Sequence, residues 1–281
     1  MNFLIVVALA LAVAAEDSIT TNYHEAIGIP EATRIWLAER AQDFDGSKIV
    51  GGQASALGAN PHLGGLIIVL TNGRQSVCGS SLISNTKLVT AAHCWRDSNS
   101  QARQFTVVLG SLRLFSGGVR IETRSVQAHA SYNTQNLNND IAIISISHVT
   151  FTNAIRRVAL ATGSNNYVGV WATAAGFGKT SDSAGISNSQ SQKHVTMQVI
   201  TNAVCTSTFG PSVITASTMC TATNAGSTCN GDSGGPLVIG SGDNRQLIGI
   251  TSFGSGSGCS RRLPAGFTRV TSFATWINAR L

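Results

Sequence analysis

The sequence predicts an all-β fold that ends in a single helix. Short runs rich in apolar and β-branched residues recur at 66–70, 105–109, 141–146 and 247–253, and clusters of Gly and Ser separate them. Of the 281 residues, 43% are hydrophobic and only 11% are charged, which indicates one large unit with a sizeable core.

The first element of the chain is an apolar run at 3–15 that ends in Val13-Ala14-Ala15. This pattern is typical of a signal peptide cleaved after Ala15, although the usual basic residues before the apolar run are missing. The run is too short to cross a bilayer, which needs about 20 apolar residues. We therefore expect 1–15 to be a signal peptide, and the protein to be secreted and to have no membrane partner.

The next segment, 16–48, carries seven acidic and three basic residues, a net charge of −4, and it contains no cysteine. A helix is predicted over 30–44, because Pro30 favours a helix start and Ile35, Trp36 and Leu37 offer a short apolar face. The length of the segment suggests a propeptide. A second helix is predicted at 271–281, where Ala274, Trp276, Ile277 and Ala279 can dock on the body.

The hexapeptide Gly231-Asp232-Ser233-Gly234-Gly235-Pro236 carries the most specific chemistry. Its glycines allow a sharp turn in which the Ser233 hydroxyl and the N–H groups of Gly231 and Ser233 converge on one carbonyl. A serine hydroxyl is a weak nucleophile near neutral pH, so it needs a general base and a group that orients this base. The motif predicts covalent acyl transfer with Gly231 and Ser233 as the oxyanion hole.

The candidate base is His93, which follows an apolar strand end and precedes Cys94. The candidate orienting group is Asp140, which opens an apolar run typical of a buried strand. A buried carboxylate that accepts the imidazole N–H would select the tautomer and stabilise the imidazolium. Each residue alone has a structural reading, but the three together predict a catalytic triad.

The order His93, Asp140, Ser233, with the motifs TAAHC, DIAII and GDSGGP, resembles the chymotrypsin-like serine proteases from residue 49 to residue 281. The resemblance implies two antiparallel six-stranded β-barrels, with the active site between them and their boundary near 151–161. It implies a serine endopeptidase that acts on proteins or peptides. The sequence as a whole resembles the digestive chymotrypsins of lepidopteran-type insects.

The sequence from Ser47 to Gly52, SKIVGG, resembles the activation site of this family. A trypsin-like protease would cut after Lys48, and the new ammonium group of Ile49 would pair with Asp232 to shape the oxyanion hole. Residues 16–48 would then be the propeptide and 49–281 the protease domain. Because no cysteine tethers it, the propeptide should leave after cleavage, unless its acidic charge holds it on the basic enzyme. Protein protease inhibitors are further possible partners, and we expect a monomer.

The resemblance also implies which residues select the substrate. Ser227 would form the bottom of the first substrate pocket, Ser252, Phe253 and Gly254 one wall, and Ala265 the other. None of these residues is acidic, so the pocket favours Phe, Tyr or Leu before the cut bond over Lys or Arg. An elastase-like preference for small residues stays open, as does a non-catalytic homologue that only binds partners.

Six cysteines in an exported chain suggest three disulfides, and six allow 15 pairings. The resemblance implies the pairs Cys78–Cys94, Cys205–Cys220 and Cys229–Cys259. We expect neither metal nor other cofactor, because the loop after Gly110 offers only Glu122 as an acidic ligand.

Residues 49–281 carry a net charge of +10, and 13 of their 16 basic residues are Arg. Nucleic-acid binding is not expected, because the chain lacks a dense basic motif. Arg keeps its charge above about pH 12, whereas Lys begins to lose its charge near about pH 10. We therefore hypothesise an extracellular site of action in an alkaline gut lumen.

Overall fold

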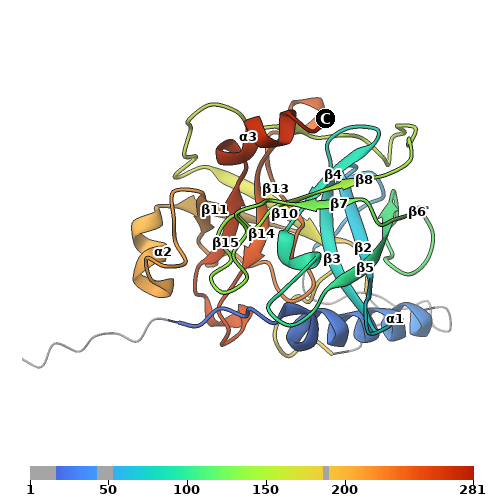
Figure 1. Cartoon of the computed structure of the whole chain (residues 1–281), viewed down its shortest axis with the longest axis horizontal. Coiled ribbons are helices and arrows are strands. Elements are labelled where there is room, and N and C mark those ends of the chain that lie inside the picture. The colour runs from blue at the N-terminus through green and yellow to red at the C-terminus, as the bar shows by residue number, and fades with distance from the viewer. Residues whose placement is uncertain (1–16, 43–52, 186–189) are drawn as a thin grey trace, which may run out of the picture.

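The computed structural model describes residues 17–42, 53–185 and 190–281, which form two β-sheets with three α-helices around them (Figure 1). The expected signal peptide and the bond between Lys48 and Ile49 lie outside the described residues. No helix in the described ranges is long and apolar enough to cross a membrane.

The first sheet has the strand order β6-β5-β2-β3-β4-β8-β7. Only Arg124 and Ser125 separate β6 from β7, so the two act as one bent strand that pairs with β5 at one end and β8 at the other. This strand closes the sheet into a six-stranded barrel. The strands are β2 (Leu63–Leu70), β3 (Gln75–Leu82), β4 (Lys87–Thr90), β5 (Ala102–Leu109), β6 (Val119–Thr123), β7 (Val126–Ala128) and β8 (Ala142–Ser145).

The second sheet is also a closed barrel of six strands. Its order β11-β10-β13-β14-β15-β12 closes because β12 pairs back to β11, with Val199 opposite Thr221. Two short strands extend it: β1 (Gln53–Ala54) pairs with β11, and β9 (Ala159–Leu160) with β14. The barrel strands are β10 (Trp171–Gly176), β11 (Lys193–Ile200), β12 (Thr218–Thr221), β13 (Pro236–Ile239), β14 (Gln246–Phe253) and β15 (Ala265–Arg269). The predicted pair of six-stranded barrels is confirmed.

The C-terminal helix α3 (Val270–Asn278) is also confirmed, and it docks through Phe273, Ala274 and Ile277, which are buried. The sequence analysis missed α2 (Asn202–Phe209), a short helix that buries Cys205 and Phe209 and whose first turn is capped by the Thr201 side chain. Only two inward apolar positions mark it, too few for a periodic signal.

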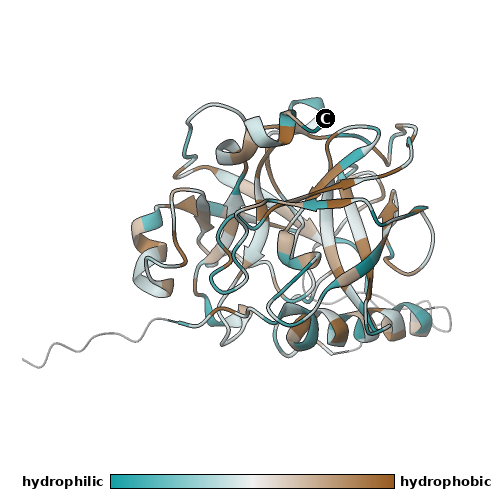
Figure 2. Ribbon diagram, in the orientation of Figure 1, coloured by the Kyte–Doolittle hydropathy of each residue, from teal (hydrophilic) through white to brown (hydrophobic). Residues whose placement is uncertain are grey.

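Helix α1 (Ile29–Gln42) lies against the first barrel, beneath its strands in Figure 1, and follows a π-helical turn at His24–Gly28. The helix confirms the prediction, but its predicted apolar face is wrong: Ile35 is buried, whereas Trp36 and Leu37 are exposed. Successive helical residues point about 100° apart, so three in a row cannot share one face. Hydrophobic and hydrophilic residues accordingly alternate along α1 in Figure 2.

Three disulfides join Cys78 to Cys94, Cys205 to Cys220 and Cys229 to Cys259, and no cysteine is free. These are the pairs that the resemblance implied. The first lies beside His93, the second ties α2 to β12, and the third joins the loop before Ser233 to the loop after β14.

Candidate active site

The topology of the first barrel brings His93 and Asp140 together. Strands β4 and β8 are antiparallel neighbours, and Thr90 at the end of β4 lies opposite Ala142 at the start of β8. His93 follows β4 in a short 3₁₀ turn, and Asp140 lies just before β8, so both emerge at the same end of the sheet. Ser233 comes from the loop between β12 and β13 of the second barrel.

Asp140 is fully buried and holds the imidazole of His93 in one orientation. Its Oδ2 lies 2.7 Å from His93 Nδ1, and its Oδ1 accepts the backbone N–H of His93 at 2.8 Å. Ser252, from the second barrel, donates its hydroxyl to Oδ2 at 2.6 Å. An ionised carboxylate only accepts hydrogen bonds, so the proton of a neutral imidazole is on Nδ1 and the basic nitrogen is Nε2. Within the described residues, this Nε2 has no hydrogen-bond partner.

The turn that carries Ser233 depends on its glycines. Gly231 and Gly234 have φ angles of +97° and +79°, a region that favours glycine, and a Cβ on Gly234 would lie 2.2 Å from Thr90 Oγ1. The carbonyl of Ser233 accepts the N–H of Gly79 at 2.7 Å. Among the described residues, the backbone N–H groups of Gly231 and Ser233 donate no hydrogen bond within the protein.

Asp232 points away from this turn, into the second barrel. Its carboxylate accepts the N–H of Gly178 at 2.9 Å and that of Cys229 at 3.0 Å. Although part of Asp232 faces a neighbouring cavity of about 780 Å³, protein atoms closely enclose the carboxyl group. This burial raises its pKa to about 6, against the opposing effect of the two backbone hydrogen bonds. The two hydrogen bonds therefore do not fully offset the cost of burying the ionised Asp232 carboxylate.

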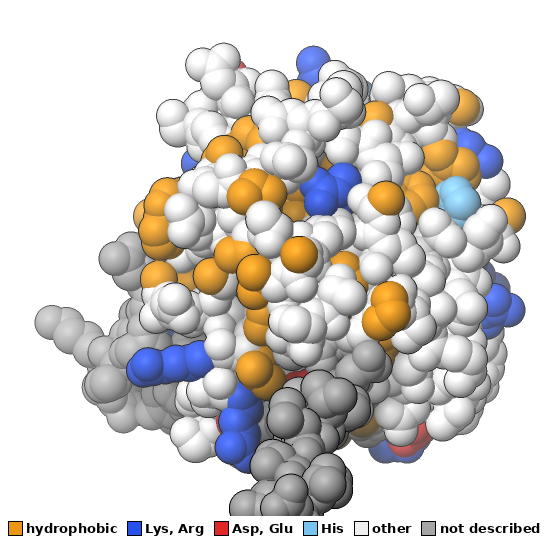
Figure 3. Space-filling model, turned by 90° about the vertical axis from the view of Figure 1, so that its left-hand side faces the viewer, with side chains coloured by type: hydrophobic (Ala, Val, Ile, Leu, Met, Phe, Trp, Pro, Cys, Tyr) orange, Lys and Arg blue, Asp and Glu red, His pale blue; other side chains and the backbone are white. Residues whose placement is uncertain are grey.

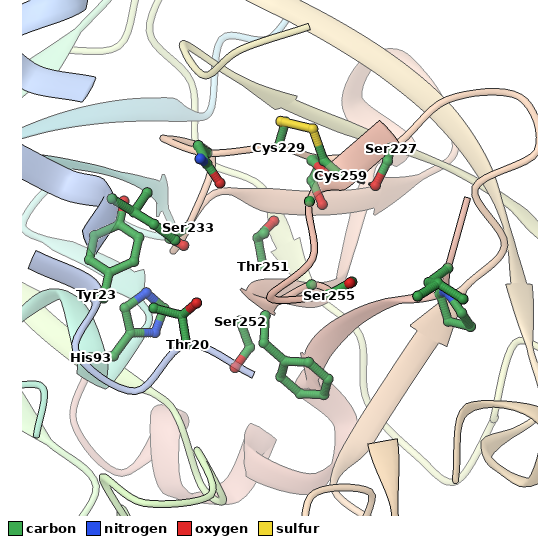
Figure 4. Close-up of a pocket in the computed structure, with 18 residues that line it drawn as sticks. Thr20, Tyr23, His93, Ser227, Cys229, Ser233, Thr251, Ser252, Ser255 and Cys259 are labelled. Atoms are coloured by element: carbon green, nitrogen blue, oxygen red, sulfur yellow. Dashed lines mark hydrogen bonds between the residues drawn. A yellow bond between two sulfur atoms is a disulfide. The ribbon is translucent and has the colours of Figure 1, made fainter. Parts of the chain in front are cut away.

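A small cavity adjoins His93 and Ser233, and it contains four of the five predicted pocket residues (Figure 4). They are Ser227, Ser252, Phe253 and Gly254. The fifth, Ala265, does not line this cavity: it is buried in the core of the second barrel beside residues such as Leu237 and Phe267. Its position in β15, paired with Thr221, turns it toward that core, so the structure does not bring its methyl group to the cavity.

Three residues of the N-terminal segment, Thr20, Tyr23 and Ile27, also line this cavity, and the sequence analysis did not identify them. Figure 4 shows the ring of Tyr23 beside both His93 and Ser233. The free volume left in the cavity is about 60 Å³, well below the roughly 300 Å³ of small ligand sites. In this form of the chain, the N-terminal segment fills the space next to the catalytic residues.

Two clusters of potential metal ligands occur among the described residues: Cys78, His93 and Cys94, and Asp182, Cys229 and Cys259. All four cysteines are in disulfides, and a disulfide sulfur is not the thiolate that binds metals. The chemistry of these clusters therefore does not fit a metal site.

Residues 49–277 match the sequence model of the Trypsin family. The chain is 36% identical to the protein named Collagenase of Hypoderma lineatum, over 99% of this chain and 97% of that protein. It is 38% identical to Brachyurin of Leptuca pugilator, over 83% of this chain and 98% of the relative. The solved structure "HL COLLAGENASE STRUCTURE AT 1.7A RESOLUTION" superimposes with a TM-score of 0.74 at 36% identity, over 83% of this chain and 98% of that chain. The chain therefore belongs to the trypsin family of serine proteases and is a serine endopeptidase.

Proposed function

We propose that the chain is the zymogen of a secreted digestive endopeptidase that cuts after large apolar residues such as Phe, Tyr and Leu. Ser233 is the nucleophile, His93 the general base and Asp140 the orienting group. The observation that carries this proposal is the buried 2.7 Å pair of His93 and Asp140, with His93 and Ser233 lining one cavity.

In the first half of the reaction, Ser233 Oγ attacks the substrate carbonyl carbon while His93 Nε2 takes the hydroxyl proton. The N–H groups of Gly231 and Ser233 bind the oxyanion, which collapses and breaks the peptide C–N bond. His93 gives its proton to the leaving amine. A water molecule then attacks the acyl-enzyme by the same route, releasing the acid and restoring the Ser233 hydroxyl. Asp140 stays ionised and stabilises the imidazolium.

Activation by cleavage after Lys48 is supported by the surroundings of Asp232. Strand β1 begins at Gln53, opposite His194, and His194 lines the cavity that Asp232 faces. Only three residues, 50–52, separate Ile49 from Gln53, and the four residue-to-residue steps between them can span about 13 Å. A free Ile49 ammonium group can then reach Asp232 and supply the charge that this buried carboxylate lacks.

The substrate preference is supported by the lining of the cavity, which has no acidic side chain among the described residues. The Ser227 hydroxyl is uncharged and donates to the carbonyl of Thr228 at 2.8 Å. It therefore offers no negative charge to a Lys or Arg side chain. Leu263 and Pro264 supply apolar surface. A Cβ added to Gly254 would meet no heavy atom within 4 Å, so the entrance admits a large side chain. This open entrance favours the chymotrypsin-like over the elastase-like reading.

Secretion is supported by the three disulfides, which fit an extracellular protein. The proposed parts are then a signal peptide at 1–15, a propeptide at 16–48 and the protease domain at 49–281. The proposed partners are an activating protease, protein or peptide substrates, and protein protease inhibitors.

The proposal is tested with matched peptides that carry Phe, Leu, Ala or Arg before the bond to be cut. The secreted chain is activated by an immobilised protease that cuts only after Lys, and Ser233→Ala is the control. We expect cleavage after Phe and Leu that the control lacks. A preference for Ala would replace the chymotrypsin-like reading by the elastase-like one. No cleavage by correctly processed protein would support the non-catalytic reading.

A further inference from the structure

The N-terminal segment 17–29 crosses from one barrel to the other directly over the catalytic residues. On the side of the second barrel, the Ser18 carbonyl accepts the N–H of Gly256 at 2.7 Å, three residues beyond β14. The N–H of Asp17 donates to the carbonyl of Thr208 at 2.7 Å. These contacts lie beside the wall of the proposed substrate pocket.

On the side of the first barrel, hydrogen bonds attach the segment at Thr21 and His24. The Thr21 carbonyl accepts the N–H of Ser98 at 3.0 Å, and the N–H of His24 donates to Asp97 Oδ2 at 2.7 Å. The imidazole of His24 also shares a hydrogen bond of 2.8 Å with Ser76 Oγ. The segment is therefore attached on both sides of the catalytic residues.

Between these attachments, Tyr23 occupies the place where chemistry must occur. Its ring centroid lies 4.7 Å from that of His93, its hydroxyl donates to the carbonyl of Val77 at 2.8 Å, and the residue is only 4% exposed. Burial raises the pKa of Tyr23, while the nearby Ser233 side chain acts in the opposite direction. The ring lies beside both Ser233 and His93 (Figure 4), so it takes up space that a substrate carbonyl needs in order to reach them.

The segment does not have the conformation of a substrate. Peptide substrates of such enzymes bind as an extended strand, whereas Tyr23 is in the right-handed helical region, with φ −50° and ψ −48°. The Asn22 carbonyl, next to it, accepts the N–H of Ala26 at 3.1 Å within this turn. The carbonyl is thus already engaged, and the segment blocks the cleft without presenting a bond to be cut.

Helix α1 anchors the N-terminal segment 17–29 on the enzyme. The carboxylate of Glu39 accepts the backbone N–H groups of Leu114 and Phe115 at 2.5 and 2.9 Å. Glu31 is buried and forms an ion pair of 3.1 Å with Lys179. The helix also packs Ala32 and Ile35 into a cluster with residues of the barrels, Phe177 among them. These contacts do not depend on the bond between Lys48 and Ile49.

We propose that segment 16–48 stays bound after cleavage at Lys48 and inhibits the enzyme as a separate chain, with Tyr23 as the blocking residue. The inference rests on the proposed function for what is inhibited. Opposite charges support the retention, because the segment carries −4 and residues 49–281 carry +10. Retention by acidic charge is the alternative to release that the sequence left open.

The test begins with activation by a protease that cuts only after Lys, since 16–47 contains no Lys and stays whole. Size-exclusion chromatography in low salt should show the cut segment co-eluting with the enzyme. The segment is then removed in high salt, and three synthetic 16–48 peptides are added back: unchanged, Tyr23→Ala and Trp36→Ala. Trp36 is the matched control, because it is an aromatic residue of the same segment that is 42% exposed.

We expect the unchanged and Trp36→Ala peptides to inhibit equally, and Tyr23→Ala to inhibit roughly 10- to 100-fold more weakly, as for a buried interface aromatic. Binding of the labelled peptides to processed Ser233→Ala protein gives a readout that needs no activity. Immediate separation of the cut segment, or equal inhibition by all three peptides, would overturn the inference. An enzyme that stays inactive without the peptide would instead contradict the proposed function, while the binding readout still decides this inference.

Discussion

At the scale of single residues, two buried carboxylates in the site have opposite surroundings. Asp140 accepts hydrogen bonds from the backbone and imidazole of His93 and from the hydroxyl of Ser252. Asp232 accepts two backbone N–H groups, yet burial raises its pKa to about 6. In the uncleaved chain, the ionised form of Asp232 is therefore a cost to stability, and pairing with an ammonium group would remove this cost.

This cost predicts a pH effect for Asp232→Asn in the uncleaved chain. The pKa of Asp232 in the folded state, about 6, lies above the ordinary aspartate value of 3.8, so the folded state binds this proton more tightly. The resulting stabilisation is complete below about pH 4 and is lost as the pH rises through about 6. Relative to wild type, the Asn variant should therefore gain up to about 2 to 3 kcal/mol of unfolding free energy between pH 4 and pH 8.

The measurement is denaturant unfolding of both uncleaved proteins at pH 4.5 and pH 8. Asp243→Asn is the control, because the Asp243 side chain is 84% exposed and should leave the pH dependence unchanged. Parallel pH dependence of wild type and Asp232→Asn would contradict the prediction.

At the scale of elements, α3 illustrates how an apolar stripe holds a helix on the barrels. Ile277 is fully buried, whereas Thr275, two residues earlier, is exposed. Helix α2 lacks such a stripe, and a disulfide and a capping threonine hold it instead. The stability of α3 should therefore depend on one face only.

We predict that Ile277→Ala lowers the free energy of unfolding by about 2 to 5 kcal/mol, because it leaves a cavity between α3 and the barrels. Thr275→Ala, in the same helix, should change it by less than about 0.5 kcal/mol. Thermal or denaturant unfolding of the two variants checks this. Similar losses in both would contradict the prediction, because Ala has a higher helix propensity than Ile or Thr and only burial distinguishes the two positions.

At the scale of the whole molecule, positive charge dominates residues 49–281, with 16 basic residues against six acidic ones. On the face shown in Figure 3, basic side chains lie apart from one another rather than in one dense patch. A dispersed, Arg-rich surface fits a protein that stays charged at high pH better than one that binds a nucleic acid.

We therefore predict an activity optimum above about pH 8. On the alkaline side, the proposed activation makes activity depend on the Ile49 ammonium group, whose pKa should rise when it pairs with Asp232. The active form is then fully supported below the free-amine pKa of about 8 and is lost as the pH climbs through the raised value. A pH profile of activated enzyme on a Phe peptide checks this, and an optimum at or below about pH 8 would reject the alkaline habitat.

The fold was predictable because local patterns suffice for it. The predicted runs at 105–109 and 247–253 lie in β5 and β14. Short apolar runs between Gly and Ser clusters are typical of buried strands, so their local pattern indicates this structure. The misassigned residues had weaker local signals: Trp36 and Leu37 follow a buried Ile35 but face solvent, and Ala265, expected in a wall of the pocket, lies in the core of the second barrel.

The sequence alone determined the chemistry of this protein. The chemistry was predicted from a serine in a glycine turn, a histidine after one strand and an aspartate before another. This combination indicates few other functions, because the role of each residue depends on its type and on the order of the three in the chain. The position of Tyr23 between His93 and Ser233 could not be read in this way. Tyr23 lies 70 positions from His93 and 210 positions from Ser233 in the chain. Contacts over such separations follow from how α1 packs on a completed barrel rather than from any local pattern.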